Sequence, residues 1–191
     1  MARTGFLATC AALLTLTLCI GDHFFHVRTG ILEYNWTPLV DGQSVWVWPI
    51  FAVGATAMVL VGTIFPVTDT GLTNIPWIPI FATSGVVVVV YFLSGQFGNS
   101  HPNEFFWVVF AVWLGRLVFQ RSDRLAVLGM SLTLAVLGVL VEAAFSKAGL
   151  FDYQVRQILG CPWWLAALYL HGGFSLLYVA RAARFLARQA G

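Results

Sequence analysis

Four histidines and two acids are the side chains of this sequence best suited to chemistry. His23 and His26 are three residues apart with Asp22 beside them, and His171 lies far along the chain. Imidazole nitrogens together with a carboxylate can bind zinc and activate a water molecule. Because no second ligand pair such as a HExxH box is present, a metal site of His23, His26 and His171 is the alternative hypothesis, and we expect no metal.

The elements that must position these groups are apolar blocks, each long enough to cross a lipid bilayer. Charged residues make up 9% of the chain and hydrophobic residues 59%, against roughly 25% charged residues in soluble domains. A crossing helix needs about 20 apolar residues. The blocks do not alternate as barrel strands would. They predict an all-α integral membrane protein with six helices in one domain, residues 1–191, at 5–25, 45–65, 76–97, 104–120, 125–145 and 162–185.

Positive charges predict which way the helices run. With both termini in the cytoplasm, that side carries seven Lys and Arg (3, 116, 121, 124, 181, 184 and 188) against three outside (28, 147 and 156). Cytoplasmic loops carry the Lys and Arg excess, so both termini are expected inside. The net charge of +2 reflects this topology, and no nucleic-acid partner is expected. The first apolar block is not followed by a small-x-small cleavage site, so we expect this helix to be retained.

Polar residues at membrane depth are the best indicators of function, since a charge at the bilayer centre costs at least about 2.5–3.5 kcal/mol. Glu142 stands about one turn from the outer end of the fifth block. It is either a carboxylate reaching the interface, or a ligand contact or inter-helix hydrogen bond. Small residues in the second, fifth and sixth blocks, including Gly172 and Gly173, predict close helix packing, within the chain or against a second copy.

Several stretches, in their order along the chain, resemble the Insig family. They are residues 61–69, with Gly62, Pro66 and Asp69; residues 119–124, with Ser122 and Asp123; residues 149–153; and then Pro162, Gly172, Gly173 and Arg181. Glu142 falls near a position where the family has Gln. High Arg usage indicates a bacterial source and hence the plasma membrane, rather than the endoplasmic reticulum of a eukaryotic member.

The resemblance implies a non-enzymatic lipid sensor with no cofactor other than a bound lipid. We expect a sterol-like or diacylglycerol-like lipid in a cavity among the helices. The expected contacts are Glu142, Gln96 and His171, with Gly172 and Gly173 keeping the wall thin. A homo-oligomer, of which a trimer is one form, and a transmembrane protein partner are also expected.

Two other functions stay open from the sequence. One is a metal-dependent membrane lipid hydrolase that uses the outer histidines, with Asp22 or Glu142 as the base. The other is a small channel or transporter, which is less favoured because no charged series follows one helix face.

Overall fold

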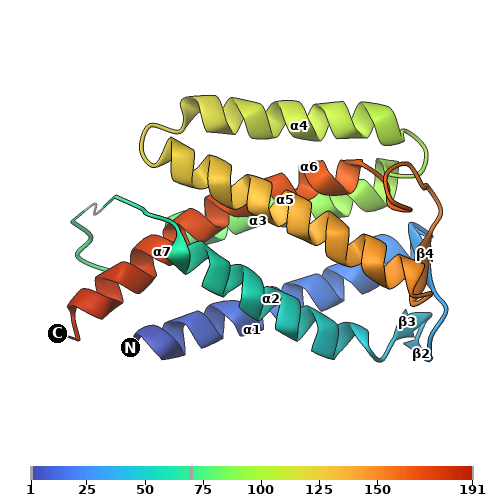
Figure 1. The fold of residues 1–191 in the computed structure, drawn as a ribbon, viewed down its shortest axis with the longest axis horizontal. Helices are drawn as coiled ribbons and strands as arrows, with labels where there is room; N and C mark the ends of the chain where they lie inside the picture. Colours follow the sequence, from blue (N-terminus) through green and yellow to red (C-terminus); the bar gives the residue numbers. More distant parts are fainter. Residues whose placement is uncertain (1, 69–70, 191) are drawn as a thin grey trace.

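The computed structural model describes residues 2–68 and 71–190 as a bundle of long helices (Figure 1). The helices are α1 (Arg3–Gly21), α2 (Val47–Ile64), α3 (Trp77–Phe97), α4 (Pro102–Phe119), α5 (Arg124–Lys147), α6 (Trp164–Leu170) and α7 (Gly172–Arg188). A π-helical segment, η1 (Asp22–Val27), continues α1. Asp69, at the end of one stretch that resembles Insig, lies outside the described residues.

Five helices of the described residues are long and apolar enough to span a membrane: Arg3–Val27, α2, α3, α4 and α5. Their outward faces are apolar, with Ile64, Ile78, Phe119 and Leu125 between 75% and 83% exposed. Such surfaces suit contact with lipid rather than water. The integral membrane class predicted from composition is therefore confirmed.

The block predicted as the sixth helix is divided at His171 into α6 and α7, of 7 and 17 residues. α6 is too short to cross a bilayer, and α7 is at the lower limit of the roughly 17–25 residues that a crossing needs. Neither is among the candidate spans of the described residues. α7 lies inside the bundle, against α1, α2, α3 and α5. The count of six crossings and the cytoplasmic termini stay predictions. Figure 1 shows both termini at the same end of the bundle, as an even number of crossings requires.

Short strands cover the opposite end of the bundle. β1 (Leu32–Tyr34) pairs antiparallel with β4 (Phe151–Tyr153), and β2 (Pro38–Val40) with β3 (Gln43–Ser44). The second pair turns at Asp41 and Gly42, which both have positive φ (43° and 88°), as a tight hairpin favours. We call this end of the bundle the strand end, and the end with both termini the terminal end.

Small residues bring the helices together, as the sequence predicted. A Cβ on Gly173 would lie 2.8 Å from the Ser131 nitrogen, so α7 packs directly on the α5 backbone. A Cβ on Gly95 of α3 would overlap the carbonyl oxygen of Phe25. The π-helical segment can therefore approach α3 only because residue 95 has no side chain.

Candidate functional site

A cavity of about 280 Å³ lies among the helices and reaches the strand end. α2 and α5 form its two long walls, and α1, η1, α3, α6 and the strands contribute the remainder. The apolar part of the lining comprises Leu18, Leu32, Trp46, Val47, Ile50, Phe51, Gly54, Ala57, Met58, Val61, Val87, Leu134, Leu137, Gly138, Val141, Phe145, Leu150, Phe151, Leu165 and Leu168.

Helical periodicity puts these wall residues on one face of each helix. The lining positions of α5 recur every three or four residues, for example Leu134, Leu137 and Val141. Leu137 and Val141 are also 51% and 50% exposed on the outside of the bundle. The cavity therefore opens sideways along α5, toward the surroundings that the apolar outer surface contacts.

Glu142 sits in the cavity wall with both carboxylate oxygens occupied. The Tyr169 hydroxyl donates to Oε1 at 2.9 Å, and the Tyr153 hydroxyl donates to Oε2 at 3.1 Å. Tyr169 can lie this close to α5 because Gly138, one helical turn before Glu142, has no Cβ, which would stand 2.7 Å from the ring. This carboxylate thus joins α5 to α6 and to β4.

Asp22 is a second buried carboxyl group in the lining, with 1% of the residue exposed. Its Oδ2 accepts hydrogen bonds from Gln43 Nε2 at 2.7 Å and from the Tyr34 hydroxyl at 3.1 Å. It is the first residue of the π-helical segment, and such segments occur often at functional sites. The side chain is held by two strands, β1 and β3, that sequence reasoning did not predict.

The polar lining gathers around these two carboxyl groups. Tyr34 donates to Asp22, Tyr153 and Tyr169 donate to Glu142, and Tyr91 lines the same cavity. No lysine or arginine is among the residues found to line the cavity in the described part of the chain. An apolar cavity with a few polar groups at one end is the arrangement that suits an amphiphilic ligand.

Of the contacts predicted from the sequence, Glu142 is the one that lines the cavity. Gln96 is exposed near the end of α3, outside the lining. His171 is fully buried elsewhere, where its Nε2 lies 3.1 Å from the Val109 carbonyl oxygen and its Nδ1 lies 2.8 Å from Arg116 Nη1. Gly172 and Gly173 pack against Leu134 and Ser131 of α5.

The histidines of the alternative metal site are engaged in other contacts. His26 Nε2 lies 2.9 Å from Ser94 Oγ, and His23 faces Asp41 at 3.9 Å. The Arg28 guanidinium, 2.7 Å from Asp41, lowers the pKa of that exposed carboxyl. The three histidines therefore do not come together, and among the described residues no three His, Cys, Asp or Glu side chains are grouped closely enough to hold a metal ion.

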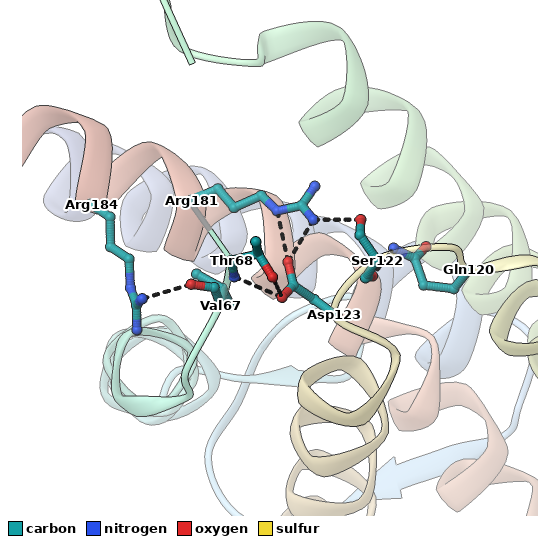
Figure 2. A network of polar contacts seen from close by, with 7 residues as sticks. All are labelled: Val67, Thr68, Gln120, Ser122, Asp123, Arg181 and Arg184. Atoms are coloured by element: carbon teal, nitrogen blue, oxygen red, sulfur yellow. Dashed lines mark hydrogen bonds and ion pairs between the residues drawn. The ribbon is translucent and has the colours of Figure 1, made fainter. Parts of the chain in front are cut away.

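A polar network of a different kind ties the loops at the terminal end (Figure 2). Asp123, just before α5, accepts hydrogen bonds from Arg181 of α7 and from the backbone and side chain of Thr68. Arg184 donates to the Val67 carbonyl oxygen at 2.7 Å. Burial alone would raise the pKa of Asp123, but the hydrogen bonds from Thr68 and Arg181 outweigh burial and lower it.

Sequence reasoning did not predict the tyrosines that hold the two carboxyl groups. Tyr153 lies in residues 149–153, which the sequence analysis used only for the family resemblance, and Tyr169 was not singled out. The signal that was available is the spacing of Gly138 and Glu142, which places an open position one turn from a carboxylate on the same helix face.

Comparison with known proteins gives a match in structure only. No protein-family model matches the sequence, and no curated protein does. The structure is similar to a mycobacterial Insig homologue, MvINS from Mycobacterium vanbaalenii, with a TM-score of 0.80 and 20% identity over 96% of each chain. A cross-linked MvINS trimer gives a TM-score of 0.79, with the same identity and coverage. The Insig resemblance is thus confirmed for the fold, and this chain has the fold of the mycobacterial Insig homologue.

Proposed function

We propose that this chain is a bacterial member of the Insig family and binds an amphiphilic membrane lipid in the cavity between α2 and α5. The observation that carries the proposal is the cavity itself, which has apolar walls, a polar group at one end and a sideways opening. Its apolar walls would contact the acyl chains, and Glu142 would meet the head group.

The size and opening of the cavity support a ligand that enters from the bilayer. A volume of about 280 Å³ is near the lower limit of the roughly 300–1,000 Å³ usual for ligand pockets. Such a volume would hold the head group and the adjoining apolar part of a diacylglycerol-like or sterol-like lipid. The exposed wall residues Leu137 and Val141 would let the remainder extend into the bilayer.

The protein would act as a lipid sensor in the plasma membrane without catalysing a reaction. Binding can regulate only if the lipid distinguishes two states of the protein, and α2 and α5 are suited to move apart because they make few contacts with each other. The cross-linked trimer of the structural relative supports a homo-oligomer, for which we propose a trimer. A second transmembrane protein would then bind one of the two states in preference to the other.

Retained lipid is the direct test. We would purify the chain in a mild detergent and measure bound lipid and metal on one sample by native mass spectrometry. A stoichiometric lipid is expected. Replacing Ala57, which lines the cavity on α2, by Phe should expel it. Val53→Phe on the same helix is the control, because Val53 is 72% exposed and lies outside the lining. Equal lipid content in both variants would refute the cavity as the binding site.

A further inference from the structure

The polar end of the cavity offers acceptors that the protein's own donors leave unused. Both hydrogen bonds to Asp22 go to Oδ2, and within the described residues no side chain donates to Oδ1. Tyr91, also in the lining, is 7% exposed, and its hydroxyl has no hydrogen-bond partner among the described residues. Both residues line the cavity, so these two oxygens can accept hydrogen bonds from a bound ligand.

This end of the cavity also holds two acids and no lysine or arginine among the described lining residues. Asp22 is buried and Glu142 is half-buried, while Arg28 of the strand-end loops pairs with Asp41 outside the cavity. Of the basic side chains, His26 lines the cavity, but its Nε2 is taken by Ser94. A buried carboxyl group without a positive partner stays protonated unless a bound cation favours its charged form, and no lysine or arginine is among the described residues that line the cavity.

Aromatic rings surround the same place. Tyr34, Tyr91, Tyr153 and Tyr169 all line the cavity. The faces of such rings attract an ammonium ion when it lies within about 6 Å of the ring centre, and the attraction increases where water is excluded. The hydroxyls of Tyr34, Tyr153 and Tyr169 donate to the two carboxyl groups, so these rings lie beside the place where a cationic head would bind.

We propose that the head group bound here is a primary ammonium carried by an amphiphile, held by Asp22, Glu142 and Tyr91. This inference rests on the lipid site proposed above and replaces the neutral head of a diacylglycerol-like or sterol-like lipid by a cationic one. An ammonium has three N–H donors, which match the open oxygen of Asp22, the Tyr91 hydroxyl and a remaining lone pair of Glu142. A single hydroxyl can donate to the open oxygen of Asp22 and accept from Tyr91, so what an ammonium adds is a positive charge opposite the two carboxyl groups.

The test compares two probes that differ only in the head group. Hexadecylamine and hexadecanol are added at neutral pH to the full chain in nanodiscs of zwitterionic lipid, and binding is followed by native mass spectrometry. The amine is expected to bind about tenfold more tightly or better, the factor that a charge-assisted hydrogen bond supplies. Butylamine, which has the same head group on a chain of only four carbons, should bind far more weakly.

Isosteric variants show whether the two carboxyl groups cause the preference. In the double variant D22N and E142Q the ratio of amine to alcohol affinity should fall to near one, with alcohol binding retained. Glu104→Gln, which removes an exposed carboxylate outside the cavity, should leave the ratio unchanged. The comparison on the unaltered chain is informative even if the double variant does not fold.

Each other result is decisive as well. Equal binding of the two probes to the unaltered chain would overturn the ammonium site and leave the lipid function standing. An amine preference that persists in the double variant would show that membrane partitioning causes it, and would also overturn the site. Failure of both probes to bind would count against the cavity as a lipid site altogether.

Discussion

Arg181 donates two hydrogen bonds to one carboxylate oxygen of Asp123, at 2.6 Å from Nη2 and 3.2 Å from Nε. Both side chains are shielded, with 9% and 5% exposed. The other carboxylate oxygen of Asp123 accepts from Thr68. A single carboxylate therefore connects the α2–α3 link, the α4–α5 link and α7, as Figure 2 shows.

Removing this carboxylate should destabilise the bundle. In Asp123→Ala the Arg181 guanidinium would stay shielded from solvent without its partner, which costs about 3 kcal/mol for a buried pair. The expected result is a lower midpoint of thermal unfolding in detergent. Arg121→Ala, two residues away and exposed, is the matched control and should leave the midpoint unchanged. Equal midpoints for the two variants would show that the pair contributes little.

The same pair predicts how stability changes with pH. The pKa of Asp123 is lowered in the folded protein, so its contribution is complete above the ordinary pKa of about 3.9 and is lost as the pH falls through the folded value. The difference in thermal midpoint between the unaltered chain and Asp123→Asn should therefore be constant above about pH 5, roughly one unit above the ordinary pKa of Asp. It should shrink in stronger acid. A difference that instead shrinks toward alkaline pH would contradict this assignment.

The apolar blocks predicted the long helices well because span length and hydropathy are local properties. The block predicted at 76–97 corresponds to α3 (Trp77–Phe97), and that predicted at 125–145 to α5 (Arg124–Lys147). The break at His171 was not predictable in this way. It lies inside an apolar run, and His171 is buried against Val109 of α4, a contact between residues distant in sequence.

The candidate site was predictable only in part, for the same reason. Glu142 stood out because a carboxylate in an apolar helix is costly without partners. Its partners Tyr153 and Tyr169 come from β4 and α6, and the pairing of β1 with β4 joins segments over a hundred residues apart. The two acceptors left open at Asp22 and Tyr91 depend on that assembled geometry.

The close approach of η1 to α3 at Gly95 can be tested by comparing Gly95→Ala with the same substitution at Gly85 of α3. A Cβ on Gly95 would overlap the Phe25 carbonyl oxygen, whereas a Cβ on Gly85 would meet nothing within 4 Å. Gly95→Ala should thus lower stability by about 1–3 kcal/mol, as overpacking does. Gly85→Ala should be neutral or raise it by up to about 1 kcal/mol, because Ala favours the helix. Thermal unfolding of both variants measures the contrast, and similar midpoints would mean that η1 does not need this approach.

Two substitutions distinguish the contact of Glu142 with the ligand from its hydrogen bonds with Tyr153 and Tyr169. Glu142→Leu removes the head-group contact and also leaves the Tyr153 and Tyr169 hydroxyls without an acceptor. Lipid retention in native mass spectrometry should fall about tenfold or more, the loss expected for a hydrogen bond to a charged group.

Tyr169→Phe is the informative partner of that variant. It removes one hydrogen bond to Glu142 and keeps the carboxylate and the ring in the cavity, so unfolding stability should fall by about 1 kcal/mol while most of the lipid is retained. Retention that falls equally in both variants would mean that Glu142 acts by holding α5 and α6 together. Retention lost only in Glu142→Leu would mean that the carboxylate itself meets the ligand.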